Sequence, residues 1–296
     1  MERASINEGF VRDLVRDQHP ELADLEIRPV PSGWDNQLWR LGDELAVRLP
    51  MTERAPALLR KEFRWLPELA KRLPLPIPTP QHFSEPTARF PRPWIVARWV
   101  PGEPADGAEI RNVYQSVDNL ARFLRALHQP APVDAPTNPG RSVPLPTLTE
   151  VFESRLAAVA EAVDVRRVRQ VWSQAIAAPH WTGPAVWLHA DLHPANALVS
   201  DGTISGIVDF GDLCAGDPAT DLAAAWKLLP QDAADSFFSS YAMTTEAAIH
   251  RAKGWAVLSA LDLLSIGRAW ERGLPGGQPT WGRAGRRILE RVFAFA

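Results

Sequence analysis

The chain begins with apolar residues at helical spacing and continues with short apolar runs typical of strands. An amphipathic helix is predicted at residues 5–16. Its apolar face consists of Ile6, Phe10, Leu14 and Val15. Three strands are predicted from the runs at residues 25–29, 36–41 and 44–49. Gly42 and Asp43 lie between the last two runs, which predicts a hairpin.

A helix and two further strands complete the first hundred residues. The helix is predicted at residues 55–73. Alternating prolines at residues 74–80 block a helix, so this segment must be extended, and it leads into a strand at 81–84. Residues 94–100 form an apolar run that ends before Pro101 and Gly102, which indicates a buried strand.

Helical periodicity dominates the rest of the chain. Helices are predicted at residues 111–128, 148–178, 218–229, 233–241, 245–266 and 280–295. His128 ends the first of them and is expected to be structural. The proline-rich residues 129–146 predict a long loop, either a binding lid or a plain linker. The pattern therefore predicts an α+β fold, with a small β-rich part at residues 1–101 and a larger, mostly helical part at 102–296.

Residues 188–221 carry the most specific chemistry of the sequence. His189, Asp191 and Asn196 form an H-x-D-x-x-x-x-N pattern, and Asp209 begins a D-F-G sequence thirteen residues later. Strands predicted at 197–199 and 204–208 would form a hairpin with Asn196 at its entrance and Asp209 at its exit. The alternative is an ordinary hairpin with turn acids and a core histidine.

This spacing suits phosphoryl transfer, which depends mainly on positioning and on neutralising charge. Asp191 can accept or orient the proton of an attacking hydroxyl group. Asn196 and Asp209 offer hard oxygen atoms of the kind that Mg²⁺ prefers. The sequence therefore predicts Asp191 as the catalytic residue and Asn196 and Asp209 as metal ligands.

Composition narrows the alternatives without selecting a substrate. The 296 residues carry a net charge of −3, which gives no electrostatic reason to expect nucleic acid as a partner. Cys214 is the only cysteine, which excludes an internal disulfide, and the histidines show no spacing typical of a zinc site. No apolar run suggests a membrane span or a signal peptide, so neither a membrane partner nor export is expected and a cytoplasmic protein is predicted.

The catalytic segment resembles that of the aminoglycoside phosphotransferase-like (choline kinase-like) small-molecule kinases. The matches are His189, Asp191, His193, Asn196, Asp209, Asp212, Gly216-Asp217-Pro218 and Asp221-Leu222-Ala223. Ala190 stands where the family usually has glycine, a change expected to matter little. The resemblance implies a protein-kinase-like bilobal fold, with a nucleotide-binding lobe at residues 1–101 and a catalytic, substrate-binding lobe at 102–296. It also implies Mg²⁺ as the cofactor and ATP or GTP as the phosphoryl donor.

The resemblance also implies a nucleotide site in the first lobe. Residues 31–36 correspond to the loop over the phosphates, with Ser32 and Asn36 as candidate contacts, although this loop has only one glycine. Arg48 occupies the strand position where the family has a lysine, and Glu62 is its candidate helix partner. Main-chain groups near Arg98 and Val100 would meet the purine at the hinge.

The acceptor is a hydroxylated small molecule in this interpretation, either an antibiotic such as an aminoglycoside or a macrolide, or a related sugar or amino alcohol. Asp262 and Glu271 are candidate partners for a cationic acceptor, and Trp270 for a flat one. Two alternatives stay open, a protein kinase and a non-catalytic nucleotide-binding module. The first is disfavoured because residues 212–216 are too short for an activation loop. The second is disfavoured because Asp191, Asn196 and Asp209 are all present.

Overall fold

The structure is a computed structural model that describes residues 6–31 and 33–295. The chain divides into two units. The first contains Met1–Arg72, Pro76–Pro101 and Ile207–Gly211, and the second contains Leu73–Leu75, Gly102–Gly206 and Asp212–Ala296. Asp209 therefore belongs to the first unit, whereas Asp191 and Asn196 of the same catalytic segment belong to the second. The assignment of nucleotide binding and catalysis to separate lobes stays a prediction.

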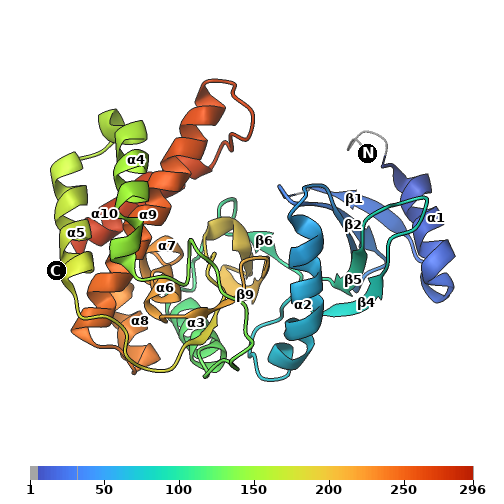
Figure 1. Ribbon diagram of the computed structural model, residues 1–296, viewed down its shortest axis with the longest axis horizontal. Coiled ribbons are helices and arrows are strands. Elements are labelled where there is room, and N and C mark those ends of the chain that lie inside the picture. The colour runs from blue at the N-terminus through green and yellow to red at the C-terminus, as the bar shows by residue number, and fades with distance from the viewer. Residues whose placement is uncertain (1–5, 32, 296) are drawn as a thin grey trace. The chain divides into compact units, whose positions relative to one another are not determined.

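The first unit is built on a five-stranded sheet in the order β1-β2-β3-β5-β4, with all neighbours antiparallel (Figure 1). The strands are β1 Ile27–Val30, β2 Asn36–Leu41, β3 Leu45–Pro50, β4 Pro80–Ser84 and β5 Trp94–Arg98. The hairpin between β2 and β3 turns at Gly42, whose φ of 57° suits a residue without a Cβ atom.

A helix packs on each face of this sheet (Figure 1). Trp94 and Val96 of β5 share a core with helix α1, Glu8–Gln18, whereas Ile95 and Ala97 face helix α2, Ala55–Ala70. This alternation is the period-two pattern of a strand that is buried on both faces. It also determines the position of Arg48, because β3 directs every second side chain toward α2.

Element boundaries in the first unit differ slightly from the prediction. Helix α1 begins at Glu8, because the side chain of Asn7 accepts a hydrogen bond from the amide of Phe10 and caps the helix. Helix α2 ends at Ala70, ahead of the proline-rich segment. Strand β5 ends at Arg98, two residues before the predicted end.

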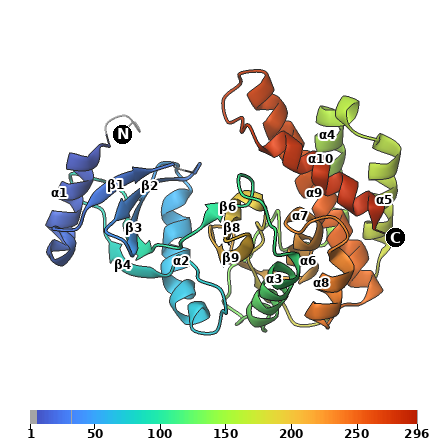
Figure 2. The same ribbon diagram turned by 180° about the vertical axis from the view of Figure 1, so that it is seen from behind.

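The second unit is mostly helical and is organised around the long helix α9 (Figure 2). Its helices are α3 Val113–Leu127, α4 Thr149–Val159, α5 Val165–Ala177, α6 Ala219–Leu222, α7 Ala224–Lys227, α8 Ala234–Tyr241, α9 Glu246–Glu271 and α10 Trp281–Ala294. Helices α4, α5, α6 and α10 all pack against α9. Short strands complete the unit: β6 Glu103–Pro104, β7 Val186–Leu188, β8 Ala197–Ser200, β9 Thr203–Ile207 and β10 Cys214–Gly216.

The prediction of one helix over residues 148–178 was wrong. The structure has two helices, α4 and α5, joined by a short 3₁₀ turn, Ala160–Ala162. Asp164 begins α5 by accepting a hydrogen bond from the amide of Arg167, at 3.0 Å. The predicted helix at 218–229 is likewise two short helices, α6 and α7, and α9 continues five residues beyond the predicted end at 266.

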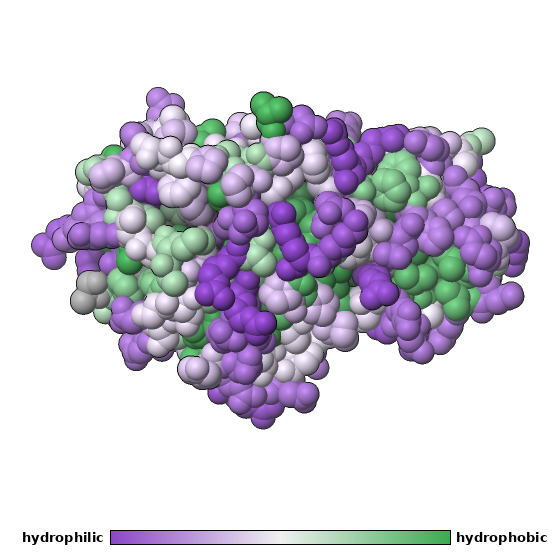
Figure 3. Space-filling view, turned by 90° about the horizontal axis from the view of Figure 1, so that it is seen from below, coloured by the Kyte–Doolittle hydropathy of each residue, from purple (hydrophilic) through white to green (hydrophobic). Residues whose placement is uncertain are grey.

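Within the described part of the chain, no helix combines the length and the apolar character needed to cross a membrane. On the face drawn in Figure 3, hydrophobic residues form several separate patches among hydrophilic ones.

Candidate active site

The loop after β7 holds the predicted catalytic residue of the second unit. The carboxylate of Asp221 accepts hydrogen bonds from the amides of His189 at 2.7 Å and Ala190 at 2.8 Å. It also lies 3.3 Å from Nε2 of His128. Burial raises the pKa of Asp221, but the contacts with His128, His189 and Ala190 lower it by more, so the net shift is downward. Asp221 therefore fixes the loop as an anion, and His128 has the structural role that was expected of it.

Ala190 carries a backbone cost. Its φ is 68°, in the left-handed region that glycine adopts freely and alanine does not. The expectation that alanine in place of glycine matters little stays a prediction. The two hydrogen bonds to Asp221 hold the loop in this conformation.

Asp191 follows immediately, and its carboxylate lies beside an arginine and a histidine. Nη2 of Arg141 donates a hydrogen bond to Oδ1 at 3.2 Å, and Nε2 of His193 lies 3.6 Å from Oδ2. Burial raises the pKa of Asp191, but His193, Arg141 and Lys227 lower it more, so the net pKa is well below its usual range. The carboxylate is 29% exposed. It is therefore ionised and accessible at neutral pH.

Asn196 is positioned by the same loop. It ends a short 3₁₀ turn, Pro194–Asn196, and is buried. Its Nδ2 donates to the main-chain oxygen of Asp191 at 2.9 Å. Among the described residues, none donates a hydrogen bond to its Oδ1. The amide is thus oriented by its nitrogen, and its oxygen is left available to a cation.

The sequence analysis missed two cations near Asp191. Arg141 lies on the proline-rich loop and also approaches Asp212, at 3.8 Å. Lys227, at the end of α7, is buried, and burial lowers its pKa to about 8. Nothing in the local sequence distinguishes Arg141 from other loop arginines. The position of Lys227 on a buried, apolar helix was the one available signal.

The three candidate acceptor residues lie in different environments. Asp262 is part of the charged region around Asp191, where Nε of Arg155 lies 2.7 Å from its Oδ1. Burial raises the pKa of Asp262, although Arg155 and Arg141 oppose this shift. Trp270 and Glu271 are exposed at the C-terminal end of α9. The structure therefore brings Asp262 near Asp191 but gives Trp270 and Glu271 no contact with this group.

In the first unit, Arg48 and Glu62 form a buried ion pair. Both guanidinium nitrogens of Arg48 donate to the carboxylate, with Nη2 3.0 Å from Oε1. Burial lowers the pKa of Arg48, but Glu62 raises it more, and Asp209 and Asp35 add to the rise. Burial also raises the pKa of Glu62 against the effect of Arg48. A guanidinium keeps its proton, so Arg48 stays charged beside Glu62. The predicted partner of Arg48 is therefore found.

Asp209 belongs to the same unit as this pair. Its φ is 62°, an uncommon conformation for a residue other than glycine. Its Oδ1 accepts a hydrogen bond from the amide of Gly211 at 3.3 Å, and the following Phe210 is fully buried. Such strain persists only where the surroundings hold the backbone, and it is typical of functional positions.

The remaining candidate nucleotide contacts are Ser32, Asn36 and the main chain near Arg98 and Val100. Ser32 lies outside the described residues. Oδ1 of Asn36 is buried and has no hydrogen-bond partner among the described residues. The neighbouring Asp35 binds Thr52 at 2.6 Å and Arg54 at 2.6 Å and 3.0 Å. At the predicted hinge, the amide of Arg98 donates to the main-chain oxygen of Thr79, and Val100 is buried.

Comparison with known proteins identifies the family and the fold of this chain. Residues 26–259 match the model of a phosphotransferase enzyme family. An aminoglycoside 3'-phosphotransferase of Escherichia coli is 28% identical over 174 residues, which cover 56% of this chain and 60% of that protein. One of Salmonella typhimurium is 28% identical over 164 residues, or 52% of this chain and 58% of that protein. The chain thus spans about 60% of the length of the curated relatives it matches.

Solved structures share the fold over almost the whole chain. The GDP complex of an aminoglycoside 2'-phosphotransferase has a TM-score of 0.69 at 18% identity, covering 98% of this chain and 99% of that one. A macrolide 2'-phosphotransferase from Brachybacterium faecium has a TM-score of 0.61 at 19% identity, covering 94% and 96%. These likenesses confirm the predicted α+β, protein-kinase-like fold. Because the family match extends over most of the chain, from β1 through the catalytic loop to α9, the protein belongs to the phosphotransferase enzyme family.

Proposed function

We propose that this protein is a Mg²⁺-dependent phosphotransferase that moves the γ-phosphoryl group of ATP or GTP to a hydroxyl of a small molecule. The observation that carries the proposal is the loop at residues 189–196. This loop presents an ionised, accessible carboxylate on Asp191 and an unshared amide oxygen on Asn196. Family membership supports the same reaction class. The relatives at 28% identity are named as phosphotransferases.

Asp191 would accept a hydrogen bond from the acceptor hydroxyl and hold it for attack. A carboxylate with a lowered pKa is a weak base, so its main contribution is orientation and not full removal of the proton. That role suits phosphoryl transfer, whose loose transition state requires little activation of the nucleophile. Arg141 occupies one oxygen of Asp191, and the other faces His193.

The residues at the predicted metal position fit magnesium. Asn196 offers an oxygen that no described residue uses, and Asp209 offers a carboxylate on a constrained backbone. Both are hard oxygen ligands. When bound, Mg²⁺ would neutralise the charge of the transferring phosphates. Arg48, oriented by Glu62, would contact the donor phosphates, and Asn36 and the main chain near Arg98 and Val100 would contribute further nucleotide contacts.

We propose that the acceptor carries little positive charge near the reacting hydroxyl. Arg141 already binds Asp191, and Arg155 already pairs with Asp262. A polycationic aminoglycoside would have to displace these cations, whereas a macrolide or a neutral sugar would not. The reaction would take place in the cytoplasm, where ATP and GTP are supplied.

The proposal is tested by measuring ATP and GTP consumption with Mg²⁺ across aminoglycosides, macrolides, sugars and amino alcohols. With any accepted substrate, Asp191→Asn should lower kcat by about 10²- to 10⁴-fold and leave nucleotide binding intact. Asp201→Asn, the same change in the exposed turn between β8 and β9, is the matched control. Equal turnover by Asp191→Asn and wild type would overturn the role of Asp191. Transfer to proteins alone would favour a protein kinase.

A further inference from the structure

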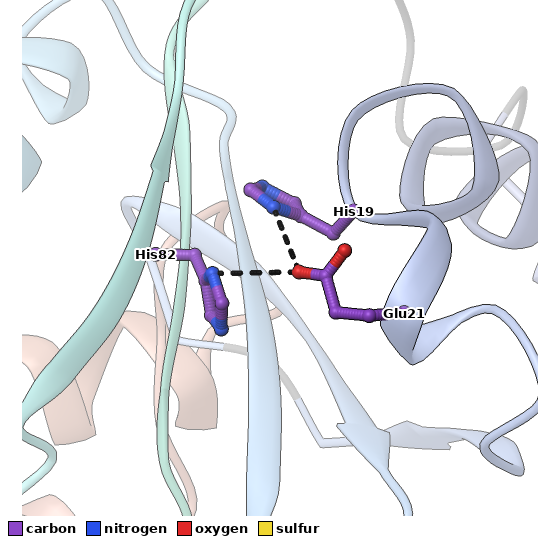
Figure 4. Close-up of side chains that lie close together, drawn as sticks. All are labelled: His19, Glu21 and His82. Carbon is purple, nitrogen blue, oxygen red and sulfur yellow. Dashed lines mark ion pairs between the residues drawn. The ribbon is translucent and has the colours of Figure 1, made fainter.

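His19, Glu21 and His82 form a cluster in the first unit, and none of them is assigned to phosphoryl transfer (Figure 4). His19 ends helix α1, Glu21 lies in the short 3₁₀ turn Pro20–Leu22, and His82 lies on β4. Nδ1 of each histidine is 3.8 Å from the same oxygen, Oε1 of Glu21. Figure 4 shows both imidazole rings directed at this carboxylate.

These separations fit shared coordination of an ion better than direct hydrogen bonds. A distance of 3.8 Å is too long for a hydrogen bond between nitrogen and oxygen. Ligands of a tetrahedral zinc ion, each about 2.0–2.2 Å from the metal, lie roughly 3.3–3.6 Å apart. One candidate ligand atom from each residue already lies within 4.8 Å of the other two. To complete the geometry, each Glu21–histidine distance would shorten by a few tenths of an ångström, and the two histidine nitrogens, which lie within 4.8 Å of each other, would also approach.

The orientation of His19 is set by contacts on the other side of its ring. Its Nε2 lies 2.6 Å from Oγ of Ser84, which is 2% exposed. The ring also packs against the edge of Trp94, with centroids 5.3 Å apart. When Nε2 donates its proton to Ser84, Nδ1 presents a lone pair to Glu21. A hydrogen bond on the distal nitrogen is the usual support of a metal-binding histidine.

Glu21 and His82 remain partly exposed, so a water molecule can reach a fourth coordination position.

We propose that His19, Glu21 and His82 bind one zinc-type divalent ion through two Nδ1 atoms and one carboxylate oxygen. Two imidazoles and a carboxylate suit Zn²⁺ and similar borderline ions, whereas Mg²⁺ prefers oxygen ligands alone. The ion would fasten the end of α1 to β4, two segments that are distant in sequence. Its role is structural, and it does not depend on the proposed phosphotransfer.

The test uses the full chain without affinity-tag histidines, stripped of metal with a chelator and then dialysed. Zn²⁺ is titrated by calorimetry, and Co²⁺ is followed by its visible absorption, which is intense for tetrahedral coordination. The expected result is one ion per chain and a melting temperature that rises with Zn²⁺ concentration. Glu21→Gln and His82→Ala should each weaken binding by about 100-fold or more, and Ser84→Ala by about 10- to 100-fold.

His250→Ala is the matched control, because Nε2 of His250 lies 3.7 Å from Glu246 in a pair without a third ligand. This variant should bind Zn²⁺ as wild type does. Circular dichroism checks that each variant is folded. The proposal is overturned if wild type binds both ions more weakly than about 1 mM. It is equally overturned if folded Glu21→Gln and His82→Ala bind with wild-type affinity.

Discussion

The charged side chains of the Arg48–Glu62 pair in the first unit and of the Asp191 loop in the second differ in their burial and in the groups that neutralise them. Both terminal nitrogens of Arg48 donate to one carboxylate, that of Glu62, and the pair is almost fully buried. Asp191 keeps 29% of its side chain exposed, and Arg141, Lys227 and the imidazole of His193 influence it from separate segments of the chain. We call the first arrangement the closed pair, because it is buried and consists of two side chains. We call the second the shared arrangement, because several groups interact with one partly exposed carboxylate.

This difference predicts how much stability is lost when one charged residue of each arrangement is substituted. A buried pair depends on both partners, because removing one leaves an uncompensated charge. A shared arrangement distributes the electrostatic effect, so that the loss of one cation is partly covered by the others. The predicted effects of substitutions therefore separate the two regions.

The largest effect is expected at Asp209. Asp209→Ala should lower kcat/KM by roughly 1,000-fold or more, because the carboxylate acts through the metal. It should weaken binding of the Mg²⁺-nucleotide more than binding of the metal-free nucleotide. Calorimetry on both forms measures this, and Asn196→Ala should show the same pattern. Equal losses with and without Mg²⁺ would contradict the assignment of metal ligands.

The closed pair is broken by Arg48→Ala or Glu62→Ala. Each should lower the free energy of unfolding by about 3–5 kcal/mol in urea titrations, because the remaining charge is buried alone. The double variant should lose less than the sum of the two. Arg28→Ala, at an exposed strand arginine, is the control and should change little.

Nucleotide binding separates the structural role of Arg48 from its functional one. Arg48→Lys keeps the charge but cannot bind bidentately, so it should recover only part of the nucleotide KM and kcat. Wild-type kinetics in folded Arg48→Ala would show that Arg48 makes no phosphate contact.

The shared arrangement is tested through Lys227. Its pKa of about 8 in the folded protein, against 10.5 ordinarily, means that folding disfavours the protonated amine. This cost is complete below pH 8 and disappears as the pH rises toward 10.5. Lys227→Met should therefore be more stable than wild type by up to about 3 kcal/mol at pH 7, and this difference should shrink across that range. Lys71→Met, at an exposed lysine, is the control. A difference independent of pH would contradict the shifted pKa.

The smallest effect is expected at the loop backbone. Ala190→Gly should raise the free energy of unfolding by about 1 kcal/mol, because glycine adopts a φ of 68° without the penalty that alanine carries. Ala197→Gly, at a buried strand residue with a φ of −109°, should instead lower it. Thermal and urea unfolding measure both changes. A loss of stability in Ala190→Gly would show that the loop is not strained at this position.

The pairing of Arg48 with Glu62 was predicted from the family resemblance, which implies a cation on this strand and a glutamate on the following helix. The structure contains this contact, because β3 directs the side chain of Arg48 toward α2. The contact between Arg141 and Asp191 could not be predicted, because a proline-rich loop has no periodicity that specifies where its side chains point. The break between α4 and α5 was missed because the apolar pattern continues across it. Asp164, whose side chain caps the start of α5, was the local signal for this break.

The sequence by itself indicated the phosphotransferase family, because the H-x-D-x-x-x-x-N pattern and D-F-G sequence are short motifs with fixed spacing. Its apolar periodicity also predicted most of the helices and strands. Only the tertiary structure decided which charges meet. It brought Asp221 under the amides of the catalytic loop and placed His19 beside His82. The histidines showed no metal-site spacing, because their proximity arises from packing α1 and β4 into one unit. Contacts between segments distant in sequence depend on how the core is packed, and no local pattern records them.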